Sequence, residues 1–208
     1  FDAVHARGAG LVAKAAAEAG VAKLVQMSAL GADEHSKAAY ARSKAGGEIS
    51  VRNAFPTASI VRPSVIFGPQ DGFFNKFGQM TKTSPALPLI GGGTSKFQPV
   101  YVGDVADAIL ACLEDDANAG KTFELAGPTI YSFKEILELV LKECGVHRGL
   151  VPLPFIAAKC LGAVLQYVPG APLTLDQMRM MQVDNVASGE LPGLEELGIA
   201  ATAAESVL

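Results

Sequence analysis

The sequence predicts an α/β fold in which helices cover both faces of a parallel sheet. Short apolar segments that suit strands alternate along the chain with longer segments of helical periodicity, an order typical of doubly wound sheets. Of the 208 residues, 50% are hydrophobic and 18% are charged, so the chain can bury a sizeable core. Its length suits one ordinary domain with a small addition.

The first elements of this pattern are clear. The alanine-rich residues 2–19 have helical spacing and stop at Gly20, a residue favoured just after a helix. Residues 23–28 predict a buried strand, residues 37–54 a helix, and residues 57–62 a second strand. Two strands joined through a helix predict a parallel pair.

The alternation continues beyond residue 70. We expect further elements at residues 73–82 (helix), 99–102 (strand), 104–115 (helix), 122–125 (strand) and 132–144 (helix). Asp104 is the expected N-cap of its helix. Ser132 and Glu135 have the spacing of a capping box, and Gly145 follows that helix as its expected stop.

A sheet of this kind normally opens with a strand and a glycine-rich turn that binds a pyrophosphate. The three consecutive glycines, Gly91–Gly93, precede a short strand and favour an ordinary turn instead. We therefore expect the first strands of the sheet to lie upstream of Phe1. We divide the chain into residues 1–149, the C-terminal portion of a Rossmann-like domain, and residues 150–208, a small mostly helical part for substrate or interaction.

Charge and composition exclude several classes of function. With 17 basic and 21 acidic residues the net charge is −4, which gives no basic field to attract nucleic acid. Cys112, Cys144 and Cys160 lie far apart, as in a reducing compartment, and no ligand spacing suggests a metal. No uninterrupted apolar segment is long enough to span a bilayer. We expect a cytoplasmic protein, free or peripheral on the cytoplasmic face of the inner membrane.

The chemistry of the chain is best argued from Tyr40 and Lys44. They are four residues apart on one predicted helix and therefore share a face. A neighbouring ammonium favours the phenolate, which would lower the pKa of Tyr40 from about 10 toward a range useful for proton transfer. Such pairs are also common on helix surfaces, so the pair by itself leaves a purely structural role open.

Two further segments point to the same edge of the sheet. Ser28 ends its predicted strand, at the carboxyl edge where open α/β sheets bind ligands. Its hydroxyl could polarise a carbonyl, or it could only cap the following loop. Residues 62–69 (RPSVIFGP) end the next strand at that edge. We expect Ser28, the Tyr40–Lys44 pair and this turn to converge on one rim.

Ser28, Tyr40 and Lys44 together resemble the Ser and Tyr-x-x-x-Lys pattern of the short-chain dehydrogenase/reductase superfamily. The segments RPSVIFGP and YVGDVADAI resemble those of its extended and atypical branches. The resemblance implies that Tyr40 is the proton donor, that Lys44 binds the nicotinamide ribose and tunes Tyr40, and that Ser28 holds the substrate oxygen. It also implies that the nicotinamide lies beside three consecutive residues, Pro63, Ser64 and Val65.

Within that superfamily the chain is most similar to the dehydrogenase-like accessory subunit of respiratory complex I and its bacterial relatives. The similar segments are residues 52–77, 96–109, 124–136, 151–155 and 191–199. This resemblance implies NADP(H) or NAD(H) as cofactor, with NADP(H) favoured, and complex I subunits or a quinone-like apolar substrate as partners.

The resemblance leaves three functions open. The first is an NAD(P)-dependent oxidoreductase associated with complex I or quinone metabolism. The second is a non-catalytic assembly subunit in which NADPH is structural, and the third is an independent hydroxysteroid-type or quinone-modifying dehydrogenase. Phe97 and Gln98 stand where sugar-nucleotide epimerases carry an arginine and an acidic residue, so the sequence argues against a diphosphate-sugar substrate.

Overall fold

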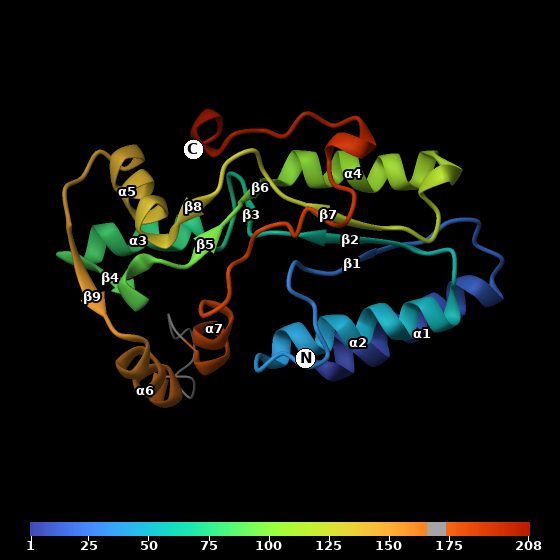
Figure 1. Cartoon of the computed structure of the whole chain (residues 1–208), viewed down its shortest axis with the longest axis horizontal. Coiled ribbons are helices and arrows are strands. Elements are labelled where there is room, and N and C mark those ends of the chain that lie inside the picture. Colours follow the sequence, from blue (N-terminus) through green and yellow to red (C-terminus); the bar gives the residue numbers. More distant parts are fainter. Residues whose placement is uncertain (166–173) are drawn as a thin grey trace.

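The computed structural model describes residues 1–165 and 174–208 and shows helices and strands in alternation (Figure 1). The helices follow a short π-helical turn at Ala3–Gly8 and are α1 (Ala9–Glu18), α2 (Ala39–Ala54), α3 (Phe74–Thr83), α4 (Val102–Glu114), α5 (Phe133–Glu143), α6 (Phe155–Leu165) and α7 (Leu175–Met180). The strands are β1 (Val25–Met27), β2 (Ser59–Pro63), β3 (Ile66–Phe67), β4 (Ala86–Ile90), β5 (Lys96–Phe97), β6 (Val100–Tyr101), β7 (Thr122–Leu125), β8 (Tyr131–Ser132) and β9 (Gly149–Leu153).

A three-stranded parallel sheet in the order β1-β2-β7 forms the centre of the fold. Helices α1 and α2 lie on one side of it and α4 on the other (Figure 1). Val61 and Phe123 of the sheet pack with Val105 of α4, whereas Val51 of α2 packs with Ala13 of α1. The predicted α/β fold with a parallel sheet is thereby confirmed.

A second layer of structure lies beside the end of this sheet. Strands β4 and β9 form a parallel pair that is covered by α3 and α5 (Figure 1). Its apolar core includes a chain of aromatic rings in which Phe73, Phe77, Phe97 and Phe133 contact one another at 5.4–6.2 Å between centroids. This second core borders the carboxyl end of β2.

Some of the expected local features differ from the structure. The strand expected to be buried is half-exposed, and Met27 is 40% exposed, because β1 pairs with β2 but with no further strand in the described part of the chain. Asp104 is not the N-cap of α4, which begins earlier, after Tyr101. Its buried carboxylate instead accepts hydrogen bonds from the backbone N–H and hydroxyl of Thr202, at 2.7 and 2.8 Å.

Other local predictions are confirmed. Ser132 and Glu135 form a capping box at the start of α5, and Gly145 follows the helix with a φ of +64°. Gly91–Gly93 form a tight turn in which all three glycines have positive φ. These signals are local in the sequence, so no knowledge of distant contacts is needed to interpret them.

The residues after 150 contact both cores. Strand β9 spans the expected boundary between residues 149 and 150 and pairs with β4. Asn185 lies against Phe97, and Leu194 packs into the core beneath α4. The division into two folding units therefore stays a prediction. Within the described ranges, no helix has the length and apolar character needed to cross a membrane.

Candidate functional site

Ser28 directly follows β1 and stays beside the end of β2. Its backbone N–H donates to the carbonyl of Val61 at 2.7 Å, and Leu30 N–H donates to the carbonyl of Pro63 at 2.9 Å. The Ser28 side chain is 3% exposed, and its Oγ is the one buried side-chain oxygen or nitrogen without a hydrogen-bond partner among the described residues. An unpaired buried hydroxyl costs about 1–3 kcal/mol, and a bound ligand is one of the partners that would offset this cost.

Tyr40 and Lys44 occupy the first turns of α2. The Lys44 Nζ lies over the Tyr40 ring, 5.7 Å from its centroid, and donates to the carbonyl of Met27 at 3.3 Å. Because Met27 immediately precedes Ser28, this hydrogen bond holds the ammonium at the end of β1. The structure therefore brings Ser28, Tyr40 and Lys44 together at one edge of the sheet, as the sequence predicts.

The electrostatics of the pair differ from the expectation. Burial raises the pKa of Tyr40, although the ammonium of Lys44 is close to its ring. Burial also lowers the pKa of Lys44, against an opposing effect from Glu48. The rings of Phe1 and His5 pack edge-on against Tyr40 at 5.8 and 5.6 Å and contribute to its burial. Burial therefore favours the protonated phenol of Tyr40.

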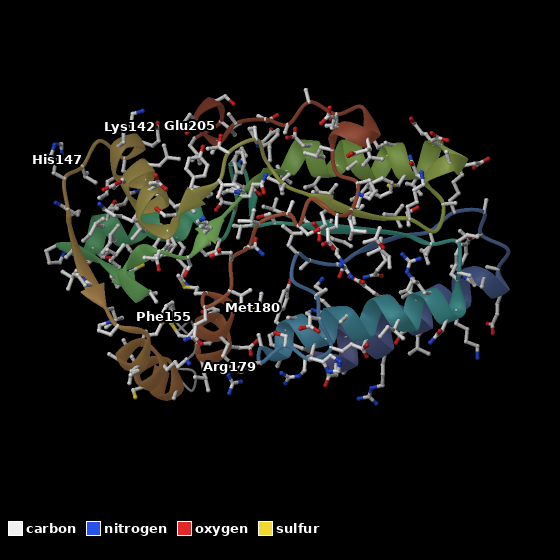
Figure 2. The ribbon with its side chains drawn as sticks, in the orientation of Figure 1. Lys142, His147, Phe155, Arg179, Met180 and Glu205 are labelled. Atoms are coloured by element: carbon white, nitrogen blue, oxygen red, sulfur yellow. The ribbon has the colours of Figure 1, made fainter. Side chains whose placement is uncertain are left out.

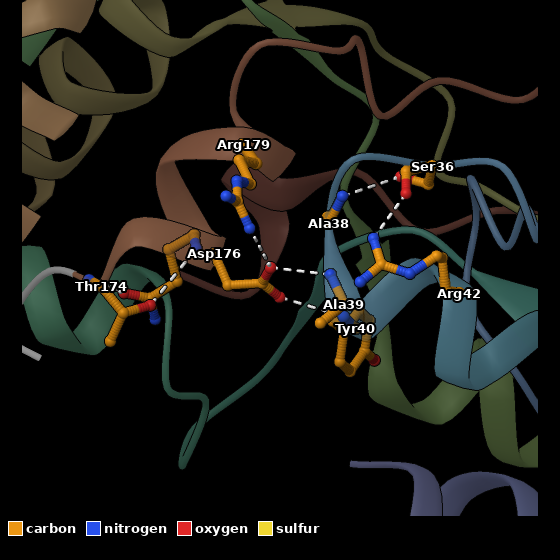
Figure 3. A network of polar contacts seen from close by, with 9 residues as sticks. Ser36, Ala38, Ala39, Tyr40, Arg42, Thr174, Asp176 and Arg179 are labelled. Carbon is orange, nitrogen blue, oxygen red and sulfur yellow. Dashed lines mark hydrogen bonds and ion pairs between the residues drawn. The ribbon is translucent and has the colours of Figure 1, made fainter. Parts of the chain in front are cut away.

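The N-terminus of α2 is capped from a distant part of the chain. The carboxylate of Asp176 accepts hydrogen bonds from Ala39 N–H at 2.7 Å and from Tyr40 N–H at 3.0 Å (Figure 3). Nη1 of Arg179 lies 4.0 Å from Oδ1 of that carboxylate. Sequence reasoning missed Asp176. One signal was available, because the N-cap of α2 is Ala38, which has no side-chain acceptor for the free N–H groups of the first turn.

The turn after β2 is fixed by a second residue that sequence reasoning missed. Asn185 Oδ1 accepts a hydrogen bond from Ser64 Oγ at 2.7 Å and one from Val65 N–H at 3.1 Å. Ser64 N–H also donates to the carbonyl of Leu125 on β7 at 2.8 Å. Pro63, Ser64 and Val65 therefore stand at the same carboxyl edge as Ser28, in a conformation held from two sides.

A partly buried ion pair joins α2 to β2 behind the site. Arg62 donates from Nε and Nη2 to the two carboxylate oxygens of Glu48, at 2.8 and 2.7 Å. The hydrogen bond to Glu48 raises the pKa of Arg62. Because Glu48 is one helical turn after Lys44, this two-pronged contact fixes the helix that carries Tyr40 and Lys44 against the strand that ends at Pro63.

An apolar cavity of about 230 Å³ opens next to Val65. Its walls come mainly from α3, β4 and α7. The lining residues are Val65, Gly72, Phe73, Lys76, Phe77, Met80, Pro88, Ile90, Phe97, Gln177, Met178, Met180, Met181 and Asn185. Three phenylalanines and four methionines among them give a wall that is apolar and adaptable.

These groups suit a nicotinamide and its ribose. The unpaired Ser28 hydroxyl offers a hydrogen bond to a substrate oxygen, and Lys44 has further donor capacity at the same edge. Within the described residues, no group of three His, Cys, Asp or Glu side chains could hold a metal ion.

Comparison with known proteins agrees with this geometry. Residues 2–126 match the NAD dependent epimerase/dehydratase family. The mitochondrial NADH dehydrogenase (ubiquinone) 1 alpha subcomplex subunit 9 of Arabidopsis thaliana is 38% identical over 187 residues, which cover 89% of this chain and 46% of that protein. Ceramide reductase of Caulobacter vibrioides is 40% identical over 165 residues, which cover 79% of this chain and 51% of that protein.

The chain spans about half the length of these curated relatives. Among solved structures, the dTDP-glucose 4,6-dehydratase of Streptomyces venezuelae, with NAD and TYD bound, matches with a TM-score of 0.64 at 21% identity, over 74% of this chain and 54% of that one. This likeness shows the Rossmann-type fold. The resemblance to the complex I accessory subunit is confirmed by the Arabidopsis relative. Since the family match covers more than half of the sequence, the chain belongs to the NAD dependent epimerase/dehydratase family.

Proposed function

We propose that the protein binds a nicotinamide dinucleotide and works as a reductase-like component associated with respiratory complex I or with quinone metabolism. The observation that carries the proposal is the meeting of Ser28, Tyr40 and Lys44 at the carboxyl edge of a parallel sheet. Family membership supports the dinucleotide, and the name of the Arabidopsis relative supports the association with complex I.

Each residue of the proposed site has a role that its chemistry allows. Tyr40, whose pKa is raised by burial, holds the proton that a reduced carbonyl oxygen requires. Lys44 holds the ribose hydroxyls, and Ser28 orients the carbonyl by donating from its unpaired hydroxyl. When bound, the nicotinamide supplies hydride chemistry. Pro63, Ser64 and Val65 form the wall against which its ring would lie, and NADP(H) is preferred over NAD(H) on the family resemblance.

A second candidate function is an independent reductase of an apolar carbonyl compound. The Caulobacter relative carries the name ceramide reductase, and the cavity beside Val65 has mainly apolar walls. This candidate uses the same site residues and differs from the first in its partners. A third, in which NADPH is a structural component of an assembly subunit, uses the same binding site without turnover.

Equilibrium binding of NADPH to the whole natural protein tests the proposed site. We expect Lys44→Ala to weaken binding about tenfold or more, because a hydrogen bond to a charged donor contributes about 1.5–3 kcal/mol. Lys14→Ala is the matched control, since Lys14 is an exposed lysine on the neighbouring helix α1. Absence of NADPH binding by the wild-type protein, or equal affinity in Lys44→Ala, would refute the proposal.

A Tyr40→Phe strain separates the functions that share this site. The substitution removes the phenolic proton and keeps the ring. A catalytic role predicts a lost reductase activity with NADPH affinity retained. A purely structural role predicts normal assembly and copurification with complex I subunits in the same strain. Copurification of the wild-type protein with those subunits tests the association itself.

A further inference from the structure

The apolar cavity borders the proposed nicotinamide site through Val65. Four of the five methionines of the chain line it, namely Met80, Met178, Met180 and Met181. Its volume of about 230 Å³ is below the ~300–1,000 Å³ of sites that take drug-sized ligands. A slim ligand such as a hydrocarbon chain fits such a space, and methionine side chains adjust easily to it.

Two amide oxygens in the cavity wall already accept hydrogen bonds within the protein. Asn185 Oδ1 already accepts from Ser64 and Val65. Gln177 Oε1 accepts from the backbone N–H of Thr174, as part of the capping box of α7. Most of the lining side chains are apolar, and an alkyl chain needs no polar partner there.

Helix α7 forms part of the cavity wall and also contacts the turn that carries Tyr40. Met178 is 1% exposed and packs in the second core, while Asp176, two residues earlier, binds the first N–H groups of α2. Figure 3 shows this carboxylate between α7 and Tyr40, and Figure 2 labels Met180 on the same helix. A helix of six residues is not stable by itself. The position of α7 therefore depends on the packing of Met178 and on the hydrogen bonds of Asp176 to α2.

We propose that the cavity binds the alkyl chain of an apolar carbonyl compound, and that α7 couples its occupancy to the position of Tyr40 through Asp176. The inference rests on the proposed function, because it names the substrate class of the same site. In this arrangement the bound alkyl chain contacts the methionines of α7 and fixes the position of that helix. Asp176 transmits the position of α7 to the first turn of α2, because its carboxylate binds the N–H groups there. Asp176 is thus a positioning residue.

Nuclear magnetic resonance of the full chain tests both parts with n-octane as the probe, which has no carbonyl oxygen to contact Tyr40 directly. Protein labelled with ¹³C at the methionine methyl groups and at Cζ of tyrosine is titrated without cofactor. We expect the signals of the four cavity methionines to shift while that of Met27, outside the cavity, stays in place. The Tyr40 signal, assigned with Tyr40→Phe, is expected to shift along the same binding curve.

Two pairs of variants separate binding from coupling. Gly72→Phe adds a ring at the cavity wall, where a Cβ meets open space, and is expected to abolish binding; Gly149→Phe, on the exposed strand β9, is the control that retains it. Asp176→Ala should keep the methionine shifts and lose the Tyr40 shift. Glu135→Ala, which removes a carboxylate cap from α5, should keep both.

Three outcomes would overturn the inference. The first is no saturable shift in the wild-type protein, and the second is a shift of Met27 with the four cavity methyl groups unchanged. The third is a Tyr40 shift that survives Asp176→Ala. If Gly72→Phe does not fold, the pattern of methionine shifts in the wild type still decides where the probe binds. Since no cofactor is present, a negative result leaves NADPH binding as a separate question.

Discussion

Glu48 and Arg62 show how single residues fix the candidate site. Glu48 lies one turn beyond Lys44 on α2, and Arg62 is the penultimate residue of β2. The Glu48 carboxylate is 9% exposed and both its oxygens accept from the guanidinium. A buried carboxylate loses its solvation, so its stability depends on this partner. The pair holds Lys44 close to the end of β1.

Removing one partner of the Glu48–Arg62 pair should therefore lower the free energy of unfolding more than removing both. We expect Glu48→Ala to lower the free energy of unfolding by about 1–3 kcal/mol, because a half-buried guanidinium loses its charged partner. The double variant Glu48→Ala/Arg62→Met should be more stable than Glu48→Ala alone. Urea denaturation measures both. Glu138→Ala, which breaks an exposed pair with Lys134, should cost less than about 0.5 kcal/mol. Strictly additive losses at Glu48 and Arg62 would contradict this account.

At the scale of elements, the close approach of the first helical turn to α2 determines the surroundings of Tyr40. A Cβ at Gly47 would lie 2.3 Å from the carbonyl oxygen of His5, so only glycine permits this contact. His5 also shares a hydrogen bond of 2.9 Å with Ser43. Through this packing, the rings of Phe1 and His5 reach Tyr40 and raise its pKa by burial.

Two neighbouring glycines provide a matched test of this packing. Gly47→Ala should destabilise the protein by about 1–3 kcal/mol, because the added methyl group collides with backbone. Gly46→Ala meets only the side chain of Ala6 at 3.4 Å and gains helix propensity, so we expect little loss or a small gain in stability. Urea denaturation of both variants is the measurement. Equal changes of stability in the two variants would contradict this account, because only a Cβ at Gly47 collides with the His5 carbonyl oxygen.

At the scale of the whole molecule, the sequence predicts the features that depend on residues close together in the chain. The alternation of strands and helices and the capping box at Ser132 follow from short-range patterns. The convergence of Ser28 with Tyr40 and Lys44 follows from the position of ligands at the carboxyl edge of open α/β sheets. Strands β4 and β9 escaped prediction because each contains a proline, which normally argues against a strand. Asp176 and Asn185 escaped it because they act on residues more than 100 positions away.

The C-terminal residues pack back against β8, and the strength of this contact should depend on pH. Tyr131 Oη on β8 donates to Glu205 Oε1 at 2.7 Å, and Figure 2 shows Glu205 near Lys142 at the end of α5. Burial and the hydrogen bond to Glu205 raise the pKa of Tyr131 to about 12. The same hydrogen bond lowers the pKa of Glu205 from its ordinary 4.5.

The two shifts define a window of pH for this contact. The folded state holds the Tyr131 proton more tightly than the unfolded chain, so its stabilisation is complete below pH 10 and is lost as the pH rises toward about 12. The folded state holds the Glu205 proton less tightly, so that stabilisation is present above pH 4.5 and is lost on further acidification.

Tyr131→Phe should therefore lower the free energy of unfolding at pH 7, with a difference from wild type that shrinks at both ends of the range. Urea denaturation at pH 4, 7 and 11 measures it. Glu205→Gln should remove the acidic limb and weaken the alkaline one, because the hydrogen bond to Glu205 helps to raise the pKa of Tyr131. A Tyr131→Phe variant as stable as wild type at all three pH values would mean that ring packing, and not the hydrogen bond to Glu205, holds the end of the chain.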